Sequence, residues 1–125
     1  MKEKASTDDA PKAPAILSQA IISNGFIFVA GQVHSTPGGE MVEGSTEDKV
    51  KQIMQNIEAI LKAAGAGLDS IVKVTIYVTD MSVMPDLNKV YPTYFTEPFP
   101  AREAVCVREL PLGAGIEISV IAAKG

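Results

Sequence analysis

The apolar residues near the N-terminus fall into two short runs that predict a β-hairpin. Residues 15–23 and 26–30 are rich in isoleucine, phenylalanine and valine, and Asn24-Gly25 stands between them. This dipeptide is typical of a type I′ turn, because both central positions need a positive φ. Gly31 follows the second run, and a glycine there leaves space for another part of the chain to approach the backbone.

Three later segments also have the character of strands. Residues 71–78 are β-branched at most positions, and alternation places one set of side chains on each face. The apolar set, which we expect on one face, consists of Val72, Val74, Ile76 and Val78. Two further extended runs, one that starts at Arg102 and one at 116–121, are joined by a turn rich in proline and glycine.

Two segments show helical spacing instead. Ser45 is a suitable N-cap with acidic residues after it, and the helix that it opens ends at Ala64-Gly65, where glycine can close the last turn. Its apolar stripe comprises Val50, Ile53, Met54, Ile57, Ile60 and Leu61. Residues 81–95 predict a second helix, which Pro92 should kink or divide.

The order of these elements, β-β-α-β-α-β-β, predicts an α+β fold with one mixed sheet and two helices on one of its faces. The strands at 104–107 and 116–121 are apolar on both sides, so the second face also needs cover. In a chain of 125 residues another copy of the same chain is the expected cover, and a closed ring is the expected assembly. We therefore predict a homo-oligomer.

Composition and charge narrow the class of protein. Apolar residues make up 46% and charged residues 21% of the chain, which is ordinary for a soluble globular protein, and no apolar run is long enough to predict a membrane span. The net charge is −4 and the pI is about 4.9. Both values argue against a nucleic-acid-binding protein, which usually carries a basic patch.

The N-terminal segment indicates neither secretion nor import. Residues 1–13 are polar and contain proline, so we expect a flexible N-terminus ahead of a single domain at 14–125. The segment lacks the features of a secretory signal and of an arginine-rich transit peptide. The single cysteine, Cys106, cannot form an internal disulfide, which suits a reducing compartment. We expect a cytoplasmic protein, or a mitochondrial one if a leader has been removed.

Arg102 and Glu117 are the strongest candidates for chemistry. Glu117 lies between Ile116 and Ile118, so alternation in a strand turns its carboxylate to the face opposite the isoleucines. A buried carboxylate is costly unless it is paired or used. Arg102 heads the preceding extended run, and we expect it to lie on the neighbouring strand, where it pairs with Glu117 or shares one ligand with it.

The other reactive side chains favour structural roles. Cys106 has no pair of histidines to activate it, and we expect a small, buried side chain. His34 is the only histidine, and its loop is rich in glycine, so we expect it at the surface. No group of His, Cys and Asp residues has the spacing of a metal site, and we predict neither a metal nor a cofactor.

Short motifs spread over most of the chain point to one family. They are Ser18-Gln19-Ala20, Gly31-Gln32-Val33, Ala63-Ala64-Gly65, Ile71-Val72-Lys73-Val74, Asn88-Lys89-Val90-Tyr91, Tyr94-Phe95, Pro100-Ala101-Arg102, Leu110-Pro111 and Ile116-Glu117-Ile118. In this order and spacing the chain resembles the reactive-intermediate deaminases, the Rid proteins, which are also labelled as the endoribonuclease L-PSP family.

The resemblance implies a chorismate-mutase-like fold and a homotrimer with clefts between its subunits. It also implies hydrolysis of reactive 2-imino acids, formed from enamines such as 2-aminoacrylate, to 2-oxo acids and ammonia without a cofactor. By position, Arg102 would hold the substrate carboxylate and Glu117 would position or deprotonate the attacking water. Gly31 and Asn88 would lie beside the cleft.

The chain departs from the family pattern at three positions near the implied site. Leu17 stands where tyrosine is frequent, Ala30 where serine or threonine is frequent, and Ala104 where cysteine is frequent. We therefore expect a more apolar pocket that depends on Arg102 and Glu117. The alternative functions are an endoribonuclease that acts on single-stranded RNA, which the family label suggests, and a non-catalytic binder of small carboxylates.

Overall fold

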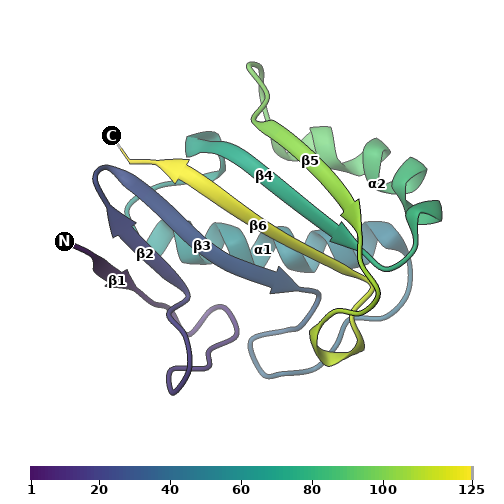
Figure 1. Cartoon of the computed structure of the whole chain (residues 1–125), viewed down its shortest axis with the longest axis horizontal. Helices are drawn as coiled ribbons and strands as arrows, with labels where there is room; N and C mark the ends of the chain where they lie inside the picture. The colour runs from purple at the N-terminus through teal and green to yellow at the C-terminus, as the bar shows by residue number, and fades with distance from the viewer. Residues whose placement is uncertain (125) are drawn as a thin grey trace.

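A six-stranded sheet is the centre of the computed structural model, which describes residues 1–124 (Figure 1). The strands are β1 (Glu3–Ala5), β2 (Ala20–Ser23), β3 (Phe26–Val33), β4 (Ile71–Val78), β5 (Ala101–Cys106) and β6 (Ile116–Ala123). They lie in the order β1-β2-β3-β6-β4-β5, with β4 and β5 parallel and the other neighbouring pairs antiparallel. The predicted mixed sheet in an α+β fold is confirmed.

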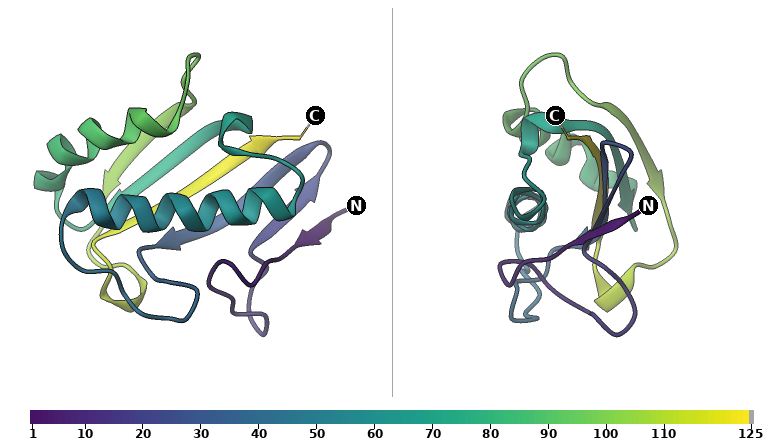
Figure 2. Two further views of the ribbon diagram at one scale, coloured as in Figure 1. Left: turned by 180° about the vertical axis from the view of Figure 1, so that it is seen from behind. Right: turned by 90° about the vertical axis from the view of Figure 1, so that its left-hand side faces the viewer.

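Two helices, α1 (Thr46–Ala63) and α2 (Met84–Val90), lie on the same side of this sheet (Figure 2). The hydroxyl of Ser45 accepts a hydrogen bond of 3.1 Å from the N–H of Asp48, and Gly65 closes the other end with a φ of +83°. Both predicted ends of α1 are therefore confirmed. Helix α2 is short, and 3-10 turns at Met81–Val83 and Tyr91–Tyr94 flank it, so Pro92 does divide the second helix.

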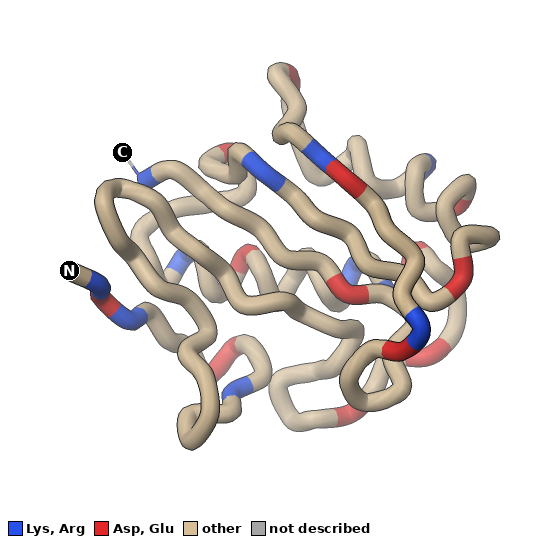
Figure 3. The backbone as a smooth tube through the Cα atoms, viewed as in Figure 1, with Lys and Arg blue, Asp and Glu red and all other residues tan. Residues whose placement is uncertain are grey.

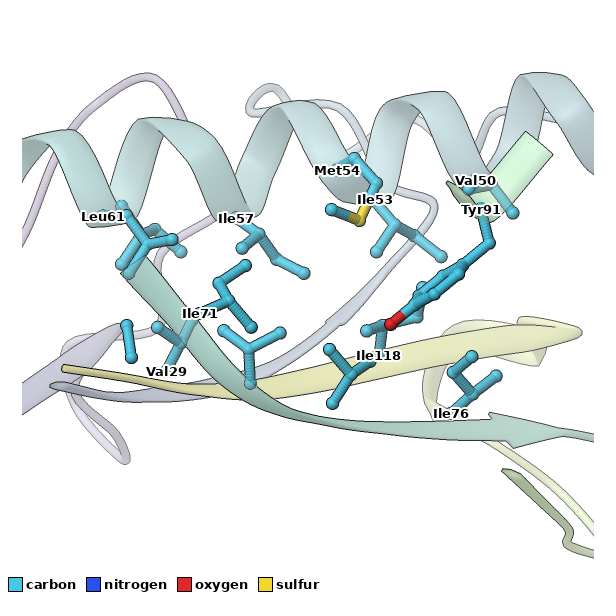
Figure 4. Close-up of a cluster of buried hydrophobic side chains, with 14 of the residues drawn as sticks. Val29, Val50, Ile53, Met54, Ile57, Leu61, Ile71, Ile76, Tyr91 and Ile118 are labelled. Carbon is cyan, nitrogen blue, oxygen red and sulfur yellow. The ribbon is translucent and has the colours of Figure 1, made fainter. Parts of the chain in front are cut away.

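The core fills the space between α1 and the sheet (Figure 4). Ile53 and Ile57 of α1 and Ile76 and Ile118 of the sheet are fully buried. Burying one such side chain stabilises the fold by about 1.5–3 kcal/mol relative to leaving it in water. The apolar stripe predicted for α1 is thus the stripe that packs on the sheet.

One strand face was predicted wrongly. The pairing of β4 with β6 shifts register between Ile71 and Lys73, which is the mark of a β-bulge. Ile71 therefore turns into the core, while Val72, expected beside Val74, is 44% exposed. From Val74 onward the predicted alternation holds.

Residues near the N-terminus pair with the sheet, in the segment 1–13 for which the sequence predicted flexibility. Strand β1 pairs with β2, and the buried amide of Gln19 ties down the segment that follows. Its Nε2 donates to the carbonyl oxygens of Thr7, Ala10 and Pro11 at 3.1, 3.2 and 2.8 Å, and its Oε1 accepts from the N–H of Thr7 at 2.7 Å.

The first predicted strand is also shorter than expected. Residues 15–19 are not part of it, because the carbonyl of Ala13 accepts the N–H groups of both Ile16 and Leu17 at 3.0 Å and closes a turn. The hairpin after it is confirmed: Asn24 and Gly25 have φ values of 53° and 79°.

The face of the sheet opposite the helices is not covered by any part of residues 1–124. Phe26 and Phe28 of β3 are 43% and 45% exposed, and Val105 of β5 is 42% exposed. We call this surface the open face. Cys106, expected to be buried, is exposed at the end of β5.

Candidate functional site

Arg102 lies on β5, the edge strand next to helix α2 (Figure 1). It pairs in register with the buried Val74, so it shares the face of the sheet that the helices cover. Its Nη2 donates a hydrogen bond of 2.8 Å to Oδ1 of Asn88, and its guanidinium carbon lies 4.8 Å from the ring centre of Tyr91. The guanidinium is exposed and held on two sides.

Glu117 lies on β6, the strand in the middle of the sheet. It pairs with Val33 of β3 and Tyr77 of β4, and its half-buried carboxylate points to the open face. Burial raises the pKa of the Glu117 carboxyl above its ordinary value of 4.5. A carboxylate that is more basic than usual is better suited to take a proton from water.

Gly31 makes the room that the Glu117 side chain occupies. The glycine lies where the register between β3 and β6 shifts, between Val29 and Gln32. A Cβ atom on residue 31 would lie 2.3 Å from Oε2 of Glu117, which is far inside van der Waals contact. The predicted close approach at Gly31 is thus present, and the group that approaches is the carboxylate of Glu117.

Arg102 and Glu117 are neither on neighbouring strands nor on the same face, which corrects the sequence prediction. Strand β4 lies between β5 and β6. On β4, Arg102 is opposite Val74 and Glu117 is opposite Tyr77, an odd number of residues apart, so the two side chains point to opposite faces. The salt bridges in residues 1–124 join Lys12 to Asp8 and Lys73 to Glu103, and none joins Arg102 to Glu117.

The other predicted site residues divide between these two places. Ala104 pairs with Ile76 and lies on the same face of β5 as Arg102, and we call Arg102, Asn88 and Ala104 the arginine group. Ala30 precedes Gly31 in β3, and we call Glu117, Gly31 and Ala30 the glutamate group.

Leu17 belongs to neither group. It is 46% exposed in the turn before β2 and lines a hollow of about 630 Å³ with Lys2, Lys4 and Lys12. Another hollow, of about 740 Å³, lies between residues near Thr7 and helix α1. Neither hollow is lined by Arg102 or Glu117. The arginine group and the glutamate group therefore lie apart from each other and from both hollows.

The prediction that His34 lies at the surface is wrong. The residue is 1% exposed. Its Nδ1 donates to the carbonyl of Val42 at 2.8 Å, and its Nε2 accepts the N–H of Gly115 at 3.1 Å. Burial lowers the pKa of this imidazole, which keeps it neutral. Because Gly115 lies just before Ile116, His34 fixes the start of the strand that carries Glu117.

Two further properties bear on function. Within residues 1–124, no three His, Cys, Asp or Glu side chains come together in a way that could hold a metal ion. Neither helix of the described chain has the length and apolar character that crossing a bilayer requires.

Comparison with known proteins gives the family. The family model described as Endoribonuclease L-PSP matches residues 7–124. A RutC family protein of Pyrococcus horikoshii is 46% identical over 125 residues, 99% of each chain. The rat protein named 2-iminobutanoate/2-iminopropanoate deaminase is 40% identical over 121 residues, 96% of this chain and 88% of its own.

A solved structure agrees with these matches. The crystal structure of yeast Mmf1 superposes with a TM-score of 0.96 at 39% identity, over 100% of both chains. The chain therefore belongs to the endoribonuclease L-PSP family, the family of the RutC and reactive-intermediate deaminase (Rid) proteins.

Proposed function

We propose that this chain hydrolyses reactive 2-imino acids, and the enamines from which they form, to 2-oxo acids and ammonia. The observation that carries the proposal is the exposed guanidinium of Arg102, which Asn88 and Tyr91 hold in place although it has no carboxylate partner within residues 1–124. A relative that is 40% identical is named for deamination of 2-iminobutanoate and 2-iminopropanoate, which supports this choice of substrate.

Arg102 binds the carboxylate of the substrate in this proposal. One N–H of the guanidinium is engaged by Asn88, and the others are left to meet two carboxylate oxygens in one plane. The carboxylate is bonded to the imine carbon, so fixing it also fixes the carbon that water attacks.

Glu117 handles the protons. Its carboxylate takes a proton from water as the water oxygen bonds to the imine carbon, and the electron pair of the C=N bond moves to nitrogen. The proton then passes to nitrogen, which gives a carbinolamine. In the second step the hydroxyl proton reaches nitrogen by the same route, the C–N bond breaks, and ammonia and the 2-oxo acid leave.

The complete site is shared between copies of the chain. The arginine group lies at the edge strand on the helix side, whereas the glutamate group faces the open side, so one small substrate cannot meet both groups of one chain. The open face is apolar and needs a partner. We therefore place the reaction at the subunit interfaces of a homotrimer, where the arginine group of one copy meets the glutamate group of the next.

The test couples the protein to a threonine dehydratase, which releases the enamine precursor of 2-iminobutanoate. Formation of 2-oxobutanoate is followed while semicarbazide traps the imine that remains. Wild-type protein should speed the reaction and Arg102→Ala should not. Arg108→Ala is the matched control, because it removes an exposed arginine of the same region that lies outside both groups. Equal acceleration by wild type and Arg102→Ala contradicts the proposal.

The endoribonuclease alternative has less support from the structure. Cleavage of RNA by paired histidines is not open to a chain with one histidine, and both ring nitrogens of His34 are engaged in the interior. Basic and acidic residues are also interspersed along the backbone rather than gathered on one element (Figure 3). The third possibility, a binder of carboxylates without turnover, is distinguished by the same assay.

A further inference from the structure

The face of the Arg102 guanidinium is covered by one aromatic ring. The guanidinium carbon lies 4.8 Å from the centre of the Tyr91 ring, which is within the range of a cation–π interaction. Tyr91 itself is 5% exposed, and its ring centre lies 4.8 Å from that of Phe95. The ring is thus fixed by the core, while the arginine above it is exposed.

Asn88 and Tyr91 act from the same helical face. They are three residues apart where α2 passes into the following 3-10 turn, a spacing that brings side chains together. Asn88 accepts a hydrogen bond from the edge of the guanidinium, and Tyr91 lies against its flat face. Together the two contacts define both the position and the plane of the Arg102 head group.

The hydroxyl of Tyr91 takes no part in this arrangement. It is buried without a hydrogen-bond partner in residues 1–124, and Figure 4 shows it directed into the apolar cluster that includes Ile118. Burial raises the pKa of Tyr91, so the phenol stays neutral. The contribution of Tyr91 to Arg102 is therefore its ring, and removing the hydroxyl breaks no hydrogen bond.

We propose that Tyr91 is a positioning residue for the carboxylate-binding Arg102, and this inference rests on the proposed function. A long, exposed arginine has many rotamers, and ordering it costs entropy when the ligand binds. The contact with the Tyr91 ring and the hydrogen bond to Asn88 already order the guanidinium in the folded protein, so the carboxylate binds to a pre-organised group. Tyr91 then affects how tightly substrate binds and has little effect on the chemical step.

The experiment compares Tyr91→Leu, which removes the ring, with Tyr91→Phe, which keeps it. The binding probe is 2-oxobutanoate, titrated into the assembled protein, and deamination is followed in parallel. We expect Tyr91→Leu to raise the dissociation constant and KM about threefold, with kcat nearly unchanged, because a cation–π contact of an exposed arginine contributes about that factor to binding. The conservative Tyr91→Phe should restore wild-type values.

Two controls separate positioning from loss of stability. Leu61→Ala truncates a buried side chain at the far end of the core from Tyr91 (Figure 4) and should lower the melting temperature without changing KM. If Tyr91→Leu does not fold, Tyr91→Met fills the same space with a flexible side chain that has no aromatic face. A normal KM in a folded variant without the ring overturns the inference.

One readout does not depend on activity. The Nε–Hε resonance of Arg102 should be shifted upfield by the ring in wild type and in Tyr91→Phe, and the shift should vanish in Tyr91→Leu. An unshifted resonance in wild type overturns the inference even if the protein deaminates. Conversely, a shifted resonance in a protein without deaminase activity refutes the proposed reaction and still supports the contact between Tyr91 and Arg102.

Discussion

Both faces of the sheet carry apolar side chains, but helices of the same chain cover only one of them. Ile76 and Ile118 are fully buried under helix α1, whereas Phe26 and Phe28, on the other face, are more than 40% exposed. The helices therefore cover one face of the sheet, and in our proposal another copy of the chain covers the open face. Glu117 is on the open face, so in our proposal assembly and chemistry use the same surface.

The largest effect should come from separating the two groups of the site onto different chains. Arg102→Ala and Glu117→Gln should each abolish deamination, since each removes one half of every site. Co-refolded in equal amounts, the two inactive variants should recover about a quarter of the wild-type activity, because a random ring pairs an intact arginine group with an intact glutamate group at that frequency.

This mixing experiment decides whether the site is shared. Activity is measured on the mixed protein after refolding, with each variant refolded alone as the control. If the two groups of one chain served one site, no mixed ring could be active, and the absence of any recovery would contradict the shared site.

A matched pair of substitutions should separate the roles of the two faces. Phe28→Asp places a charge on the open face and should yield monomers without deaminase activity while the chain stays folded. Ile57→Ala leaves a cavity under α1 and should lower the free energy of unfolding by about 2–5 kcal/mol, with assembly and activity intact at low temperature. Sedimentation measures assembly, circular dichroism measures folding and stability, and the coupled assay measures activity.

The expected outcomes differ in kind, which makes the pair informative. Assembly that survives Phe28→Asp would show that the open face is not the interface. Loss of assembly in a folded Ile57→Ala protein would show that the covered face contributes to association as well as to the fold.

Gly31→Ala should lower activity less than the loss of Arg102 or Glu117 does. The decrease should affect the chemical step rather than substrate binding. The new Cβ would overlap Oε2 of Glu117, and the flexible carboxylate can move away while the backbone remains in place. A displacement of about 1 Å is enough to slow a reaction about a hundredfold. We expect kcat to fall by about that factor with KM little changed, as measured in the coupled assay.

The control is Gly38→Ala, where the nearest atom to the new Cβ is the Thr36 hydroxyl oxygen at 3.9 Å, an ordinary contact. NMR titration of Glu117 gives a second check, because a carboxylate moved toward solvent should regain a pKa nearer to 4.5. Unchanged kcat in Gly31→Ala would show that the position of Glu117 does not matter to the reaction.

Local signals in the sequence were sufficient to predict helix α1 and the hairpin of β2 and β3. Ser45, the apolar stripe and Gly65 act within the helix itself, and Asn24-Gly25 defines its own turn. The exposure of Val72 could not be predicted in the same way, because the bulge that causes it arises only when β4 pairs with β6. Strand pairing over long distances is not encoded in the alternation of one strand.

The candidate site shows the same limit. Arg102 and Glu117 were chosen from residue type, position and family resemblance, and their roles remain predictions. Their placement was wrong because two runs joined by a short turn suggested neighbouring strands, whereas β4 enters between them from earlier in the chain. The burial of His34 was not predicted, because its hydrogen-bond partner, the N–H of Gly115, is 81 residues away and no local sequence pattern indicates this contact.

The smallest expected effect is a pH dependence of stability that arises from His34. Burial, which is the main cause, and the nearby Lys49 lower the pKa of the folded imidazole below 6.5, although the Val42 carbonyl and Glu43 act in the opposite direction. Below pH 6.5 the unfolded chain therefore takes up a proton before the folded chain does, and stability must decrease as the pH falls. Protonation of Nε2 also removes the acceptor for Gly115, a hydrogen bond worth about 1 kcal/mol.

Urea unfolding of wild type and His34→Gln, compared at pH 8 and at pH 5.5, isolates this contribution because the other acids titrate in both proteins. The advantage of wild type over His34→Gln should shrink at the lower pH, and a constant difference, or an imidazole that titrates above 6.5 by NMR, would contradict the buried, neutral histidine that holds the start of β6.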